Sequence, residues 1–188
     1  MTIVYTPPLI EARRAAVRCL SDGRKVSTDD EAARYVDERG FCSLMHLSGC
    51  ALPSISEADS RDPWAGFDIT DGAWRWKETL PQARRCAYGK YLKQRGFFIS
   101  WELFPALYAL SGNPPAGSEP AGGFRQDYED GLLGRLEYLV LETVQERGPI
   151  DSRQLWRALK NGFGANRSRF EQALVTLQSS FRIMVAGG

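Results

Sequence analysis

The chain has 188 residues, of which 43% are hydrophobic and 25% charged, and its formal net charge is +1. This composition is typical of a globular protein that buries a core. Its apolar runs are too short to cross a bilayer, and its first residues lack the order of a secretory signal. We therefore expect a cytoplasmic protein with no membrane partner.

The four cysteines, Cys19, Cys42, Cys50 and Cys86, form no C-x-x-C pair, which argues against a zinc ribbon or a redox motif. Cys42, His46 and Cys50 are evenly spaced, but no fourth ligand accompanies them and the spacing matches no common zinc site. We expect buried thiols, no metal and no cofactor.

Charged residues are unevenly distributed along the chain. Pro81–Phe97 contains five basic residues and no acid, and Asp151–Gly188 contains six basic residues and two acids. Between them, Glu119–Glu146 contains seven acids and two basic residues. The pattern is consistent with one anion-facing side and, equally, with an ordinary mixed surface.

In the N-terminal half, Thr28 and Glu31 form a capping box that predicts the start of a helix, and Gly40 predicts its end. A short strand is expected at 41–45. Residues 51–72 are rich in Ser, Pro, Asp and Gly, which predicts a long loop.

The middle of the chain predicts a helix opening at 74–77 and two strands, 86–92 and 97–100, joined by a turn. A further helix is expected within 101–110, where Pro105 favours a late start.

The Pro- and Gly-rich segment 111–123 offers little that packs and is the best domain boundary. We predict an N-terminal winged-helix-like unit with a β-hairpin over residues 1–110, a linker over 111–127, and a C-terminal winged helix-turn-helix over 128–188.

The C-terminal segment supports this boundary. Apolar periodicity predicts a helix over 128–147, a second helix capped by Asp151, a turn at 161–164 and a third helix over 167–179, followed by a strand at 181–186. The predicted fold class is α+β, mainly helical, with tandem winged helix-turn-helix units and short β-hairpins.

The third helix of this segment is a candidate for DNA contact. Phe170, Ala173, Leu174 and Leu177 share one apolar face, and the opposite face is polar and nearly free of acids. A major groove accepts such a helix, while Arg side chains at its start meet phosphates. The candidate DNA-binding residues are Arg167, Ser168, Arg169, Gln172 and Thr176. A solvated helix, or a surface for dimerisation or protein docking, is the alternative.

Aromatic and basic residues alternate in the middle segment. Arg84, Arg85 and Lys90 are candidates for DNA binding, and Trp74 and Tyr88 for base stacking. The alternative is that these aromatic residues belong to the core.

Trp74 and Trp76 separate these two interpretations. On a helix, residues two apart point about 200° from each other. We therefore expect Trp76 in the core and Trp74 partly exposed, beside Lys90.

Signals for catalysis are weak. The single histidine lies in no triad, and the chain has no Walker loop and no G-x-G-x-x-G motif. Asp68, Asp71 and Glu78 lie near the tryptophans in sequence and are candidate acids or bases.

A resemblance to a known family rests on the segments WRWKETLPQARRCAYGKYLKQRGFFISWELFP and FEQALVTLQSSFRIMVAG. With them, residues 32–186 resemble the AlkZ-related proteins, which are similar to the AlkZ/YcaQ-type DNA glycosylases. The resemblance implies tandem winged helices and DNA binding. Those glycosylases remove alkylated bases or unhook interstrand crosslinks without a cofactor.

The chain departs from the glycosylase pattern in two ways. The family's Gln-apolar-Gln or Gln-apolar-Asp motif would fall at Phe41–His46, which contains neither Gln nor a carboxylate. No catalytic residue is therefore carried over. The strand predicted at 181–186 would be the first strand of the wing, and it runs almost to Gly188. We therefore expect the wing's return strand to be missing or to be supplied from elsewhere.

The leading hypothesis is a winged-helix protein that binds double-stranded DNA and is a non-catalytic relative of a repair glycosylase. The alternatives are a glycosylase for alkylated or crosslinked bases with a different residue set, and a protein-interaction module.

Overall fold

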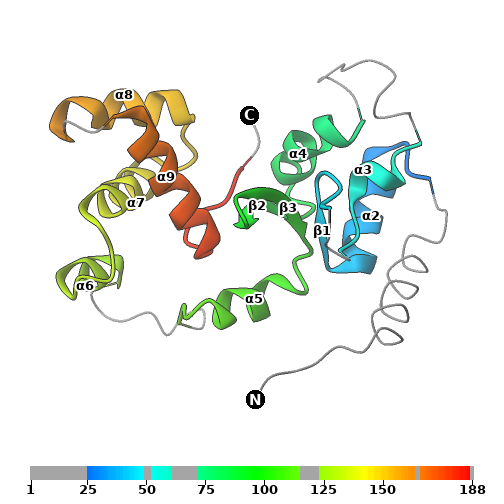
Figure 1. The fold of residues 1–188 in the computed structure, drawn as a ribbon, viewed down its shortest axis with the longest axis horizontal. Coiled ribbons are helices and arrows are strands. Elements are labelled where there is room, and N and C mark those ends of the chain that lie inside the picture. The colour runs from blue at the N-terminus through cyan, green and yellow to red at the C-terminus, as the bar shows by residue number, and fades with distance from the viewer. Residues whose placement is uncertain (1–24, 49–51, 61–71, 115–122, 164–165, 187–188) are drawn as a thin grey trace. The chain divides into compact units, whose positions relative to one another are not determined.

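The computed structural model describes residues 25–48, 52–60, 72–114, 123–163 and 166–186. Within these ranges the fold is mainly helical, with one three-stranded sheet (Figure 1). The predicted mainly helical α+β class is confirmed, whereas the tandem winged-helix arrangement stays a prediction. None of the described helices combines the length and the apolar character that a membrane span requires.

The chain divides into two compact units, each discontinuous in sequence. Of the described residues, those within 25–88 and 96–103 form unit 1, and those within 89–95 and 104–186 form unit 2. The division crosses both strands of a β-hairpin, so the tip of this hairpin belongs to unit 2 and its base to unit 1.

The first described helix of unit 1 is α2 (Asp29–Arg39), and it begins as predicted. The Thr28 hydroxyl accepts a hydrogen bond from the Glu31 main chain, and the Glu31 carboxylate accepts one from the Thr28 N–H, each at 3.2 Å. Gly40, at φ 72°, ends the helix in the left-handed region that glycine favours.

The sheet contains β1 (Phe41–Ser43), β2 (Ala87–Leu92) and β3 (Arg95–Ile99), in the order β1-β3-β2. In the antiparallel pairing of β1 with β3, Phe41 lies opposite Ile99 and Ser43 lies opposite Phe97. The predicted strands are present, but β3 begins earlier than expected and the turn of the hairpin is only Lys93-Gln94.

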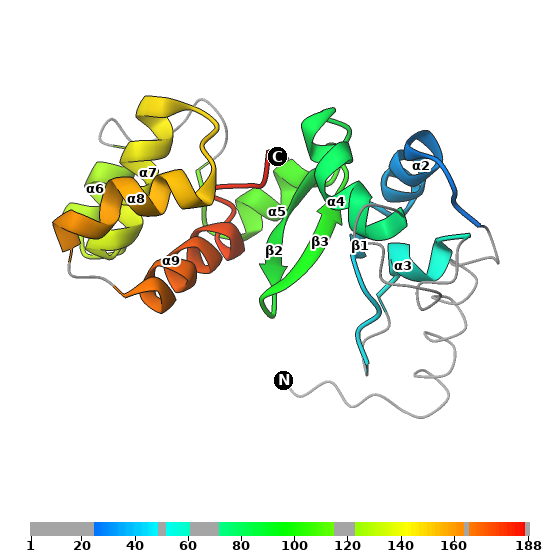
Figure 2. The same ribbon diagram turned by 90° about the horizontal axis from the view of Figure 1, so that it is seen from above.

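The core of unit 1 forms between the sheet and α2, α3 (Ile55–Ala58) and α4 (Gly72–Gln82) (Figure 2). Its largest fully buried side chains are Tyr35, Ile55, Trp76, Leu80 and Phe98. The prediction that residues 51–72 form only a loop is wrong where α3 occurs. Ile55 and Ala58 are buried there, and burial stabilises a turn of helix that local composition disfavours.

The helices of unit 2 are α5 (Phe104–Leu110), α6 (Gly123–Glu129), α7 (Arg135–Arg147), α8 (Ser152–Phe163) and α9 (Arg167–Ser179). Helix α7 packs against α6, α8 and α9. The core between them contains Leu133, Val140, Leu141, Leu155, Phe170 and Leu177. Asp151 caps α8 as predicted, because its carboxylate accepts hydrogen bonds from the Arg153 and Gln154 N–H groups.

Three predictions in unit 2 are wrong. The turn expected at 161–164 does not begin where predicted, because α8 continues through Phe163. The single helix expected over 128–147 is divided into α6 and α7, because the chain turns at Gly131, whose φ is 75°. The strand expected at 181–186 does not form. Phe181 has a φ of 60°, and the following residues form a bend and a single bridge at Val185.

Candidate nucleic-acid interface

Helix α9 is held with its predicted apolar face inward. Phe170, Ala173 and Leu177 are buried. At the start of the helix, the Asn166 side chain accepts a hydrogen bond of 2.9 Å from the Arg169 N–H. This cap fixes where the helix begins, and the buried residues fix its rotation about its own axis.

The opposite face of α9 is accessible. Ser168, Arg169, Gln172 and Thr176 are all exposed. Because Arg169, Gln172 and Thr176 follow one another at intervals of three and four, they lie on one side of the helix. The structure therefore brings together, on one exposed surface, four of the five residues that sequence predicted for this helix.

Arg167, the fifth, is engaged within α9. Its Nε lies 2.8 Å from the Glu171 carboxylate, one helical turn away. Its guanidinium also lies 5.7 Å from the Trp156 ring and 5.5 Å from the Phe170 ring. Within the described residues Arg169 has no ion-pair partner, so the two arginines are not equivalent. The i, i+4 spacing of Arg167 and Glu171 is the signal in the sequence that predicts this difference.

Lys90, at the hairpin tip, lies against the last turn of α9. Its main-chain N–H donates a 2.8 Å hydrogen bond to the Gln178 side chain, and its carbonyl accepts one of 3.2 Å from the Ser179 hydroxyl. Next to it, the Tyr91 ring stacks on Phe181, with centroids 4.6 Å apart. The Lys90 side chain itself is exposed. Nothing local in the sequence reveals this association, since its partners are far apart along the chain.

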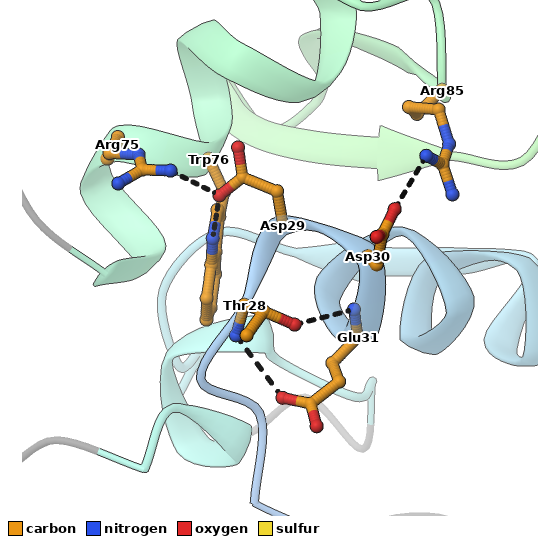
Figure 3. A network of polar contacts seen from close by, with 7 residues as sticks. All are labelled: Thr28, Asp29, Asp30, Glu31, Arg75, Trp76 and Arg85. Atoms are coloured by element: carbon orange, nitrogen blue, oxygen red, sulfur yellow. Dashed lines mark hydrogen bonds and ion pairs between the residues drawn. The ribbon is translucent and has the colours of Figure 1, made fainter.

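The remaining candidates belong to unit 1. Trp76 is buried at 1% exposure and Trp74 is 37% exposed, which confirms the predicted difference in burial, whereas the expected place of Trp74 beside Lys90 stays a prediction. The indole N–H of Trp76 donates to the Asp29 carboxylate at 3.1 Å, and Arg75 pairs with the same oxygen (Figure 3). The cation beside Trp74 is Lys77, whose Nζ lies 3.9 Å from the ring centroid.

Arg85 and Tyr88 make structural contacts in unit 1. Arg85 pairs with Asp30 of α2 at 2.8 Å (Figure 3). The Tyr88 ring packs against Phe98, with centroids 4.8 Å apart, and lies so close to Gly96 that a Cβ there would collide with its hydroxyl. Burial raises the pKa of Tyr88 to about 12. These contacts favour the core interpretation for Tyr88.

Arg84, next to Arg85, is exposed and adopts a φ of 54°. Its carbonyl accepts a hydrogen bond of 2.8 Å from the Trp101 indole. On the Arg84 side this contact uses only the main-chain carbonyl, so the Arg84 guanidinium can still reach an anion.

The segment where the glycosylase motif would fall, residues 41–46, begins with β1, in which Cys42 and Ser43 are buried and Phe41 is half-buried. Cys42 is 0% exposed and Ser43 1%. The Ser43 hydroxyl donates to the Pro53 carbonyl at 3.3 Å, and burial raises the pKa of Cys42 far above its usual range. Neither side chain can reach a bound nucleotide.

The described candidates for acid–base catalysis or metal binding do not lie together in one site. Glu78 is exposed, 3.8 Å from Lys77, whereas Asp68 and Asp71 lie outside the described residues. The His46 Nδ1 lies 3.0 Å from Glu57. No cluster of three potential metal ligands occurs in the part of the chain that the structure describes.

Comparison with known proteins gives one result. Residues 26–188 match the protein family described as AlkZ related. No curated protein and no solved structure matches the chain. The family match begins just before α2 and continues through α9, so it covers the described parts of both units and confirms the predicted resemblance. The chain therefore belongs to the AlkZ-related family.

Proposed function

We propose that this protein binds double-stranded DNA through the exposed face of α9 and does not excise bases. The observation that carries the proposal is the exposed, acid-poor set Arg169, Gln172 and Thr176 on one side of a helix whose other side is buried. A major groove admits a helix of this kind. Membership of a family related to the AlkZ/YcaQ-type DNA glycosylases supports DNA as the ligand.

The exposed side chains of α9 are suited both to contacts with phosphates and to contacts with base edges. Arg169 provides a cation for a phosphate or for the major-groove edge of guanine. Gln172 provides an amide that can donate to and accept from an adenine. Glu171, the one acid in α9, is neutralised by Arg167, which lowers the repulsion that it would exert on a phosphate backbone.

The residue types and the burial around β1 support the proposal that the protein does not excise bases. Hydrolysis of an N-glycosidic bond needs a positioned water and stabilisation of the charge that develops as the base departs. Residues 41–46, where the glycosylase motif would fall, contain neither Gln nor a carboxylate. Within this segment the Cys42 thiol is buried, and the buried Ser43 hydroxyl is already hydrogen-bonded to the main chain. We therefore assign no catalytic residue.

The test is a salt titration of binding to three duplexes of one sequence: plain, abasic and containing 7-methylguanine. We expect affinity that falls steeply with salt and does not depend on the lesion. Alkaline cleavage of the 7-methylguanine duplex after incubation should show no product above background. Lesion preference with base release would instead establish an active glycosylase, and no binding to any duplex would favour a protein-interaction module.

A further inference from the structure

In a winged helix, the recognition helix is usually followed directly by a strand of the wing, and α9 is not followed by such a strand within residues 181–186. A strand was expected directly after the helix, but residues 181–186 form none. The position next to the last turn of α9 is taken by the hairpin tip, residues 89–95, which comes from much earlier in the chain and belongs to the same unit. The tip therefore occupies the place of a wing.

The hairpin tip is attached to α9 through its main chain and one aromatic ring. Gln178 and Ser179 bind the N–H and the carbonyl of Lys90. The Tyr91 ring stacks on Phe181, and Phe104 packs edge-on against Phe181 with centroids 5.6 Å apart. This mode of attachment uses none of the tip's charged groups.

The charged groups of the tip all have one sign. Lys90, Lys93 and Arg95 are exposed, and the sequence from Ala87 to Ile99 contains no acid. Among the residues that the structure describes, none of these three cations has an ion-pair partner. They are therefore available to an anionic ligand.

The turn between β2 and β3 contains two non-glycine residues with a left-handed backbone conformation. Lys93 and Gln94 have φ values of 48° and 59°, as a two-residue hairpin turn requires. Glycine and asparagine adopt this left-handed backbone most readily, and a lysine there is strained. A strained lysine at the tip of a loop is an observation from which a functional role can be inferred.

We propose that the tip of the β2–β3 hairpin is the wing of α9, and that Lys93 and Arg95 bind phosphates of the same DNA duplex. This inference rests on the proposed function, because it names a second contact made while α9 occupies the groove. Each phosphate that a lysine or arginine neutralises releases a counterion, so each contact contributes to the salt dependence of binding.

The experiment compares Lys93→Gln/Arg95→Gln with a matched control, Arg125→Gln/Arg147→Gln. The control removes two exposed cations of unit 2 that lie in α6 and α7. Binding of the full chain to one plain duplex is measured over a range of salt concentrations. The hairpin variant should lower the salt slope by about 1.8, since each lost phosphate contact removes about 0.9, whereas the control should keep the slope of the wild type.

The outcomes separate the two ideas. If the wild type binds and the hairpin variant keeps its slope, or if the control loses as much, the wing assignment is wrong while DNA binding by α9 stands. If the wild type does not bind duplex DNA, the proposed function fails and the wing fails with it. Unchanged thermal unfolding of both variants verifies that only surface charge has been altered.

Discussion

Gln178 and Lys90 lie 88 positions apart in the sequence, yet the Gln178 side chain accepts a 2.8 Å hydrogen bond from the Lys90 main chain. The two ends of α9 therefore differ in their surroundings. The last turn holds the hairpin tip, while the first turns carry the exposed Arg169 and Gln172. We therefore expect substitutions at the start of α9 to change DNA affinity, and substitutions at its end to change stability as well.

At the start of α9, Arg169→Glu should weaken duplex binding by more than about tenfold at low salt, because charge reversal replaces an attraction to phosphate by a repulsion. Arg167→Glu should have a smaller effect, since Arg167 is already paired with Glu171. Fluorescence anisotropy with a labelled duplex measures both. Equal losses for the two variants would show that the Glu171 pair does not restrain Arg167.

At the end of α9, Gln178→Ala/Ser179→Ala removes both hydrogen bonds to Lys90. We expect the free energy of unfolding to fall by about 1–3 kcal/mol, at about 0.5–1.5 kcal/mol for each bond, as urea denaturation would report. Duplex affinity should fall as well, because the cations of the tip lose their fixed position. Thr176→Ala is the control: Thr176 is exposed on the binding face, so its loss should reduce affinity with little effect on stability.

The two tryptophans of α4 should respond differently to truncation. Trp76→Ala should cost roughly 3–5 kcal/mol, because it leaves a large cavity in the core. Trp74→Ala should cost about 1 kcal/mol or less, the value of an exposed cation–π contact, here with Lys77. If Trp74 stacks on bases, its loss should also weaken binding to single-stranded DNA. Thermal unfolding and a single-strand titration measure the two effects, and similar large stability losses would assign both rings to the core.

Glu31 predicts a pH dependence of stability. Hydrogen bonds, first from the Ser27 main chain and then from its hydroxyl and the Thr28 N–H, lower the pKa of Glu31 below its ordinary 4.5. Such a carboxylate stabilises the folded state above its unfolded pKa, and the contribution is lost as the pH falls through the folded pKa. Glu31→Gln should therefore be less stable than the wild type at pH 7, and the difference should shrink below pH 4.5. A difference that stays constant down to pH 3 would contradict this account of the cap.

Local signals in the sequence predicted local structure well. The bounds of α9 follow from its apolar spacing, and the start of α2 follows from Thr28 and Glu31, because capping and periodicity involve residues within one or two turns. The different burial of Trp74 and Trp76 follows in the same way from helical geometry.

Features that depend on distant partners were missed. A strand was expected at 181–186 because its residues are mostly apolar, but a strand also needs a neighbour, and the described structure provides only a bridge at Val185. The short helix α3 was missed because its stability comes from burial rather than propensity. The contact between the hairpin tip and Gln178 was also not predicted, because no short-range pattern in the sequence encodes a contact between residues 88 positions apart.

The discontinuity of the two units has a consequence for dissecting this protein into fragments. A fragment beginning at Phe104 would retain every helix of unit 2 but would lose Tyr91, the ring stacked on Phe181. Cutting before the hairpin instead would take β2 and β3 away from β1, whose partner is β3. No single cut in the sequence yields both units intact. An autonomous C-terminal fragment therefore requires a grafted copy of the hairpin, or a circular permutation that keeps residues 89–95 covalently attached to α9.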